Sequence, residues 1–272
     1  MTSLFVCPIC GEALAREEGR YGCPAGHSFD VAREGYVNLL PPNRQHSKAP
    51  GDDREMAAAR SRFLDGGWYG PLRQALCTLA EKYAPDRPVL LDVGCGEGWY
   101  TAALARTAAS LDGRTAGIDL SKPAVKKAAR RCPGSEIAVA SAYHLPLGNG
   151  AVDLLTDCFS PLAPEEFYRV LKPGGIFLYV VPGPRHLWEL KSVLYDSPYE
   201  NEEKREEYSG FQYREVVPIE CSFTLPSRQE IGDLYRMTPY FWKTPKAGAE
   251  RLGALERLTV TAQFRIHVME KI

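Results

Sequence analysis

The sequence lacks any apolar run that approaches the roughly twenty residues needed to cross a membrane. Its first stretch, residues 1–6, is too short and too uncharged for a signal peptide, which favours a cytoplasmic protein without membrane contact. The formal net charge over 272 residues is only -1. A protein that coats nucleic acid by its bulk charge is therefore excluded, and any contact with nucleic acid must depend on local patches.

The cysteines lack the dense, paired spacing of a secreted disulfide framework. Three of the eight lie before residue 25, and the others are scattered without regular spacing. With 44% hydrophobic and 25% charged residues, the composition is that of an ordinary globular protein. A chain of 272 residues has room for one large domain with a sizeable core and a small satellite module.

The early cysteines and one histidine form a pattern typical of zinc ligands. Cys7 and Cys10 lie on one tight turn, and Cys23 and His27 lie on another, in the spacing C-x2-C-x12-C-x3-H. Two turns that each offer two ligands fit a tetrahedral, structural Zn2+ site; four unrelated residues are the alternative. Zinc binding would supply the folding energy of a β-rich module over residues 1–38, which is too short to build its own core. Because the module carries three arginines against five acidic residues, its bulk charge will not hold RNA.

Residues 39–52 are rich in proline and polar residues and show no periodicity, which indicates a linker. A mobile phosphate-binding strap and a solvated loop are equally good interpretations of its basic residues. Two helices are expected within residues 53–83, the first ending at the Gly66-Gly67 pair and the second opening at Pro71. The whole segment 53–272 is expected to form the large domain.

That domain is organised around an apolar run followed by three glycines. Residues 89–93 predict a buried strand, and Gly94, Gly96 and Gly98 follow it directly. Because glycine has no Cβ, the turn can take positive φ and let a ligand lie against bare backbone. The next apolar stretch ends in Asp119, about twenty residues on, where a neighbouring parallel strand places a carboxylate for a ribose diol.

Two kinds of nucleotide site share this glycine spacing. The dinucleotide pattern G-x-G-x-x-G needs a third glycine at residue 99, where this chain has Trp99. The form D-x-G-x-G-x-G, which begins at Asp92, instead resembles motif I of the Rossmann-like, class I S-adenosylmethionine (SAM) methyltransferases. That resemblance implies SAM as the cofactor in place of NAD or FAD.

Strand and helix patterns alternate through residues 86–183, which predicts an α/β fold with a parallel sheet and helices on both faces. Residues 184–272 are expected to add a helix and two strands, completing a seven-stranded sheet with one antiparallel member. The ligand should lie at the carboxyl ends of the strands, where the glycine loop, Asp119, Ser141 and Asp157 converge. The predicted strands cover residues 89–93, 115–119, 136–140, 152–156, 176–181, 211–225 and 258–271.

Two further stretches allow a structural and a functional interpretation. The predicted helix over residues 121–132 carries five basic residues, for which a solvated helix face is favoured over an RNA-binding patch. Residues 238–242 hold a cluster of aromatic side chains, for which hydrophobic core is favoured over a base-stacking surface.

Three stretches together closely resemble the RlmA family of 23S rRNA (guanine-N1)-methyltransferases, and the resemblance covers essentially the whole chain. They are the zinc-ligand module running on through residues 29–40, the glycine loop over residues 91–98, and the segment Pro182–Leu187. The resemblance implies transfer of a methyl group from SAM to N1 of a guanine in a 23S rRNA hairpin. It also implies a homodimer in some relatives, paired through the side of the zinc module.

The resemblance carries over to individual residues. Cys7, Cys10, Cys23 and His27 match the zinc ligands. The expected SAM site combines these family contacts with motif I and comprises Tyr69, Asp92, Gly94, Gly96, Glu97, Asp119 and His186. A histidine at a helix N-terminus with no ligand is the alternative for His186. The chain has Trp68 where the family has histidine, and Asp157 stands at a variable position, so no catalytic base is assigned.

Methyl transfer from a sulfonium is a direct displacement, so the protein chiefly aligns the two reactants and excludes water. No Asn-Pro-Pro-Tyr-type tetrad follows the fourth strand, where residues 157–161 read Asp-Cys-Phe-Ser-Pro, which argues against methylation of an exocyclic amine. No Pro-Cys pair offers the nucleophile of cytosine C5 enzymes. A small-molecule SAM methyltransferase with a zinc lid and a non-catalytic zinc protein that binds RNA are the two alternatives.

Overall fold

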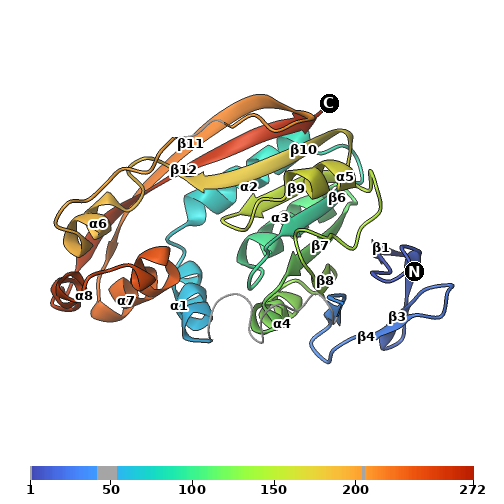
Figure 1. Cartoon of the computed structure of the whole chain (residues 1–272), viewed down its shortest axis with the longest axis horizontal. Coiled ribbons are helices and arrows are strands. Elements are labelled where there is room, and N and C mark those ends of the chain that lie inside the picture. Colours follow the sequence, from blue (N-terminus) through green and yellow to red (C-terminus); the bar gives the residue numbers. More distant parts are fainter. Residues whose placement is uncertain (1, 42–53, 204–205) are drawn as a thin grey trace.

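The computed structural model describes residues 2–41, 54–203 and 206–272. Its N-terminal module is a four-stranded sheet in the order β1-β2-β3-β4, and each pair of neighbouring strands is antiparallel. The strands are β1 (Thr2–Val6), β2 (Ala13–Glu17), β3 (Arg20–Gly22) and β4 (Ser28–Asp30). Figure 1 shows this module at one end of the molecule and helices α6, α7 and α8 at the other.

The large domain contains one eight-stranded sheet in the order β11-β12-β10-β9-β6-β7-β8-β5. Only β12 runs antiparallel to its neighbours β10 and β11, while the pairs from β10 to β5 are parallel. The strands are β5 (Val37–Asn38), β6 (Val89–Val93), β7 (Arg114–Asp119), β8 (Glu136–Val139), β9 (Val152–Cys158), β10 (Leu171–Pro182), β11 (Phe211–Leu225) and β12 (Leu258–Lys271).

The sheet therefore confirms the predicted α/β architecture with a single antiparallel strand, and it has one strand more than the seven predicted. The additional strand is β5, whose Val37 and Asn38 pair with Ala138 and Val139 of β8. A two-residue strand with one apolar side chain gives no periodic signal, so the pairing could not be found from the sequence.

A second difference concerns the start of β10. The sequence predicts a helix to residue 171, a closing turn over 172–175 and a strand from Ile176. In the structure α5 (Pro164–Val170) ends one residue earlier, and β10 already begins at Leu171, which pairs with Val152 of β9. The register shifts between Leu171 and Ile176, so the Pro-Gly-Gly turn is absorbed as an irregularity within the strand.

The sheet is buried on both faces because successive residues of each strand point to opposite sides. Leu90, Leu154 and Leu178 belong to one core, which is shared with α2 (Gly70–Tyr83), α3 (Trp99–Ser110) and α6 (Trp188–Leu194). Their neighbours Leu91 and Leu155 belong to the opposite core, which includes side chains of α5 and of the N-terminal module. The remaining helices are α1 (Arg54–Asp65), α4 (Lys122–Arg131), α7 (Arg228–Met237), the 3-10 helix η2 (Pro239–Trp242) and α8 (Lys246–Gly253).

The N-terminal module is packed firmly against the sheet. Phe5 and Tyr21 are almost fully buried in the core that they share with β6 and β9. The Glu136 carboxylate on β8 accepts hydrogen bonds from the Ser3 hydroxyl at 2.5 Å and the Leu4 amide at 3.0 Å. It also pairs with Arg114 at 2.6 Å. The module thus has a fixed place beside β8.

The basic side chains of α4 keep the exposed face expected for that helix, and two of them also contact the N-terminal module. Lys126 and Arg130 contact the Glu34 carboxylate at 2.9 and 3.1 Å. Glu34 lies some ninety residues away in the sequence, so charge patterning within the helix could not reveal these contacts.

Among the described residues, no helix is long and apolar enough to cross a membrane.

Candidate active site and metal centre

The four predicted metal ligands come together in the N-terminal module. Cys7 and Cys10 lie on the turn after β1, and Cys23 and His27 lie on the turn between β3 and β4. Their ligand atoms all lie within 4.8 Å of one another. The Cys10 and Cys23 sulfurs are 3.7 Å apart, and His27 Nδ1 lies 3.6 Å from Cys7 Sγ and 3.4 Å from Cys23 Sγ.

The three separations between 3.4 and 3.7 Å match the edges of a zinc tetrahedron. Zn–S bonds near 2.3 Å and Zn–N bonds near 2.0 Å place neighbouring ligand atoms about 3.4–3.8 Å apart. Three thiolates and one imidazole are also a donor set that Zn2+ prefers. Because all four positions are taken by protein atoms, the metal centre is structural, and His27 would bind through Nδ1.

A cavity of about 700 Å³ lies at the carboxyl ends of the parallel strands. This volume is typical of a small-molecule site. Its floor is formed by the loops after β6, β7 and β9, and its cover comes from α1, the end of α7 and η2. The expected cofactor residues Tyr69, Gly94, Gly96, Glu97, Asp119 and His186 all line it, whereas Asp92 does not.

Each glycine of the loop is required for a different reason. At Gly98 (φ 81°) a Cβ would lie 2.9 Å from Ala128 Cα, so this glycine lets α4 pack against the loop. At Gly94 (φ 67°) a Cβ would lie 2.2 Å from Ser160 Cβ, so this space is filled by protein. At Gly96 (φ 55°) a Cβ would meet nothing within 4 Å. Only Gly96 therefore offers bare backbone beside open space in the cavity wall.

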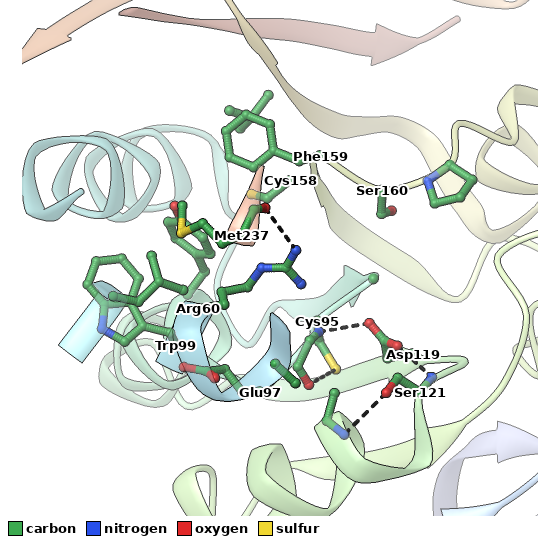
Figure 2. A pocket seen from close by; sticks show the side chains of 18 of the residues that line it. Arg60, Cys95, Glu97, Trp99, Asp119, Ser121, Cys158, Phe159, Ser160 and Met237 are labelled. Atoms are coloured by element: carbon green, nitrogen blue, oxygen red, sulfur yellow. Dashed lines mark hydrogen bonds between the residues drawn. The ribbon is translucent and has the colours of Figure 1, made fainter. Parts of the chain in front are cut away.

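Asp119 lies beside that open position at the end of β7. Its Oδ2 accepts a hydrogen bond from the Gly96 amide at 2.9 Å, and its Oδ1 accepts one from the Ser121 amide at 2.7 Å. Figure 2 shows the Asp119 carboxylate between Cys95 of the glycine loop and Ser121. A carboxylate at the end of this strand, beside a glycine loop, is the group that binds the hydroxyls of a ribose in nucleotide sites of this kind.

Asp92 is placed below the cavity and not in its wall. Its side chain is buried, and its oxygens accept hydrogen bonds from Thr101 Oγ1 at 2.5 Å and Thr156 Oγ1 at 2.8 Å. Burial raises the pKa of Asp92 to about 6. The residue ties β6 to α3 and β9, and so it holds the loop in place from beneath.

Glu97 connects the glycine loop to the cover of the cavity. Its carboxylate accepts a hydrogen bond from the Ser61 hydroxyl of α1, and Arg131 of α4 lies 3.6 Å away. Lys127 donates to the same Ser61 hydroxyl at 2.8 Å. Burial raises the pKa of Glu97. Glu97 lines the cavity, but its polar contacts among the described residues go to α1 and α4.

Tyr69 and His186 line the cavity and pack against Phe264, which is buried behind them. The Tyr69 ring contacts Phe264 edge-on, with ring centroids 4.9 Å apart, and His186 lies 4.9 Å from the same ring. His186 Nδ1 lies 2.8 Å from the Gln263 carbonyl. A carbonyl only accepts, so Nδ1 carries the proton and Nε2 is an acceptor. Burial lowers the pKa of His186 to about 4, which keeps the ring neutral at physiological pH.

The wall formed by the loop after β9 was not assigned any role from the sequence. Phe159 is 47% exposed, lines the cavity and has φ 62°, a left-handed conformation that is strained for a bulky side chain. Ser160 follows it in the wall. Figure 2 shows Phe159 and Ser160 on one side of the cavity and Glu97 and Trp99 on another.

Arg60 was also missed. It projects from α1 into the cavity, as Figure 2 shows, and its guanidinium lies 3.5 Å from the Met237 carbonyl. The available signal was a basic residue on the inward-facing stripe of an otherwise apolar helix face.

The aromatic cluster over residues 238–242 fits both interpretations, hydrophobic core and base-stacking surface. Tyr240 is buried at the cavity edge, while Trp242 is 66% exposed.

Comparisons with known proteins match both the N-terminal module and the large domain. A family profile described as "RlmA, N-terminal" matches residues 5–48, and one described as "Methyltransferase domain" matches residues 91–179. A Micromonospora griseorubida protein that carries the provisional name 23S rRNA (guanine-N(1)-)-methyltransferase is 36% identical, over 96% of this chain and 95% of that protein. The Streptomyces fradiae 23S rRNA (guanine(748)-N(1))-methyltransferase is 40% identical, over 69% of this chain and 66% of its own length.

Proposed function

This chain belongs to the family of 23S rRNA (guanine-N(1)-)-methyltransferases, and we propose that it transfers a methyl group from SAM to N1 of a guanine in 23S rRNA. The observation that carries the proposal is the cavity at the strand ends, where Gly96 leaves bare backbone beside open space and Asp119, bonded to the Gly96 amide, lines the same cavity. The same molecule holds a four-ligand metal centre in the module that matches the RlmA profile.

The residues of the cavity fit SAM. Asp119 is suited to the ribose hydroxyls, and the wall of Tyr69, His186 and Trp99 offers apolar surface with one neutral acceptor, His186 Nε2. Arg60 supplies a positive charge for a carboxylate at the covered side of the cavity. Asp92 acts indirectly, since it lies beneath the loop and accepts a hydrogen bond from Thr101.

When bound, SAM supplies an electrophilic methyl group on a sulfonium. The protein has to hold an acceptor atom in line with that group and keep water out. The cover from α1, α7 and η2 restricts access of water from one side. A guanine within a helix cannot enter such a cavity, so the target nucleotide must be unstacked and turned out of the RNA.

Two aromatic side chains at the cavity wall are suited to hold the extruded base. Tyr143 is 54% exposed and Phe159 is 47% exposed, and both line the cavity. Both rings leave about half of their surface exposed at the wall, and base–aromatic stacking contributes roughly 1–3 kcal/mol per base. The left-handed φ of Phe159 is a local strain of the kind that functional sites maintain.

The form of the RNA, its contact with the zinc module and the pairing of two protein chains are part of the same proposal. We infer that the RNA element is a hairpin, which the zinc module contacts by shape and a few side chains, and that the protein can pair into a homodimer on the module side. Methylation of ribosomal RNA in bacteria also implies a cytoplasmic enzyme. The exposed Ile9 on the first zinc turn, 63% accessible, is an apolar contact available on that side.

The test is transfer of tritium from labelled SAM to 23S rRNA that lacks the modification, with a metabolite extract as the parallel acceptor. The expected result is label in the rRNA and arrest of primer extension at one guanine, because a methyl on N1 blocks Watson–Crick pairing. Label only in the metabolite fraction would instead establish a small-molecule methyltransferase. A protein that binds no SAM in calorimetry would be a non-catalytic RNA-binding protein.

A further inference from the structure

A buried carboxylate lies directly behind the cavity wall. Asp157 is near the carboxyl end of β9 and its side chain is fully buried. Its Oδ1 accepts hydrogen bonds from the amide and the hydroxyl of Ser160. Its Oδ2 is buried and has no hydrogen-bond partner among the described residues. A buried polar atom without a partner is rare in proteins and calls for an explanation.

Ser160 connects this carboxylate to the cavity. Its hydroxyl lies 2.8 Å from Asp157 Oδ1 and 3.3 Å from the Val93 carbonyl, and the residue itself lines the cavity. The absence of a side chain at Gly94 is what admits Ser160, since a Cβ there would lie 2.5 Å from Ser160 Oγ. The glycine loop therefore holds a hydroxyl beside the expected cofactor position, with a carboxylate behind it.

We propose that Ser160 and Asp157 form the proton-accepting pair for the guanine, with Ser160 touching the N1 edge of the base and Asp157 acting through it. This inference rests on the proposed function. Guanine N1 carries a proton that must leave when the nitrogen is methylated, and neither the cavity nor the family resemblance had supplied an acceptor for it. Phe159, next to Ser160 in the wall, would stack the base so that its edge meets the hydroxyl.

The step balances with groups that are present. As N1 attacks the methyl carbon, the new N–C bond forms and the C–S bond breaks, leaving its electron pair on the neutral sulfur. The N1 proton passes to Ser160 Oγ, and the hydroxyl proton of Ser160 passes to Asp157 Oδ1. Asp157 ends the step as a neutral carboxylic acid, and it returns the proton to solvent after the product has left.

The electrostatic surroundings suit an acceptor that works near neutral pH. Burial raises the pKa of Asp157 to about 7, and the charge of Asp92 on β6 acts in the same direction. Tyr179 on β10 and Cys158 on β9 also interact with Asp157, and burial raises the pKa of both, so both are neutral. A base is most effective when its pKa lies near the working pH.

The experiment compares wild type with Asp157→Asn, Ser160→Ala and the double variant, using 23S rRNA and saturating SAM over a range of pH. We expect each single variant to lower kcat roughly 10²–10⁴-fold, the contribution of a general base, with KM for the RNA unchanged. The double variant should be no slower than the slower single variant, because the two residues act as one unit. Asp153→Asn, on the same strand at its other end, is the matched control and should keep the wild-type pH profile.

Two readouts separate this role from a structural one. The wild-type rate should rise with pH through the Asp157 ionisation, and Asp157→Asn should lose that inflection and recover rate only in alkaline solution, where guanine N1 ionises by itself. SAM affinity in calorimetry should be unchanged in both variants. Variants that keep the wild-type kcat and inflection, or whose losses simply add in the double variant, would overturn the pair. A wild type that labels no rRNA would overturn the proposed function instead.

Discussion

Gly96 and Gly98 provide a matched pair of substitutions that separates the folding role of the glycine loop from its binding role. Both residues have positive φ, 55° and 81°, so alanine at either position is strained by roughly 1–2 kcal/mol. The positions differ in what a methyl group would meet. At Gly98 it would lie 2.9 Å from Ala128 Cα and 3.1 Å from Cys132 Sγ, whereas at Gly96 it would project into open space.

The expected free energies of unfolding follow from this difference. Gly96→Ala should lose only the strain, roughly 1–2 kcal/mol. Gly98→Ala should also suffer overpacking of the α4 contact, typically 1–3 kcal/mol, for a total of roughly 2–5 kcal/mol. A domain with a stability of about 10 kcal/mol, in the middle of the usual range, stays folded after either loss. Urea unfolding of the two variants at one temperature measures the difference directly.

SAM affinity should follow the opposite order. A methyl group at Gly96 stands where the cofactor would lie against the backbone, and each 1.4 kcal/mol of lost contact weakens binding about tenfold. We expect at least that loss in Gly96→Ala and a smaller one in folded Gly98→Ala, measured by calorimetry. The reasoning is refuted if Gly96→Ala binds SAM like wild type, or if Gly98→Ala is no less stable than Gly96→Ala.

Three other predictions concern the module, the base and the buried carboxylate. Cys23→Ser or a strong chelator should remove zinc and abolish methylation of rRNA while SAM binding persists, as metal analysis and calorimetry would report. Cys221→Ser is the control. Methylation retained by Cys23→Ser would exclude the module from recognition of the RNA. Phe159→Gly should leave the free energy of unfolding within about 1 kcal/mol of wild type, because relief of roughly 1–2 kcal/mol of backbone strain offsets the lost contact with Phe264. Methylation of rRNA by this variant should nevertheless fall. A wild-type rate would contradict the stacking role of Phe159. Since burial raises the pKa of Asp157 from 3.8 to about 7, the folded protein holds this proton more tightly than the unfolded chain. Its stabilising effect is complete below pH 4 and lost by about pH 7, a decline of up to roughly 4 kcal/mol, which urea titrations should detect in wild type and not in Asp157→Asn.

The features that the sequence predicted are those carried by short spacings. Cys7 and Cys10 are separated by two residues, so one turn suffices to aim both sulfurs at a common point. The parallel strands and the convergence of Gly96 and Asp119 follow from the regular alternation of strand and helix, which leaves few topologies open. Local patterns and the general rules of chain connection were therefore enough to predict both the metal centre and the floor of the cavity.

What the sequence could not reveal depends on contacts between distant segments. Motif I places Asp92 next to a cofactor, but in the structure its carboxylate accepts hydrogen bonds from Thr101 and Thr156 beneath the cavity. Spacing says that a residue is near the site, and it does not say whether the side chain faces the ligand or supports the loop. The cover of the cavity by α1 and α7 has the same origin, since those helices are separated by more than 160 residues of chain.

The placement of the zinc module gives its acidic composition a physical meaning. Glu34 receives Lys126 and Arg130 of α4, while Arg131 of the same helix reaches Asp65 of α1 at 2.8 Å. Exposed ion pairs of this kind contribute about 0–1 kcal/mol each to the free energy of unfolding. Their main effect is therefore to orient the module and α1 relative to α4. Since α4 also packs on Gly98, one helix fixes the module, the cover and the glycine loop relative to one another. If the module holds the RNA as proposed, the RNA would meet the cavity at a set distance, and the guanine would have to turn out of the RNA to bring N1 to the methyl group.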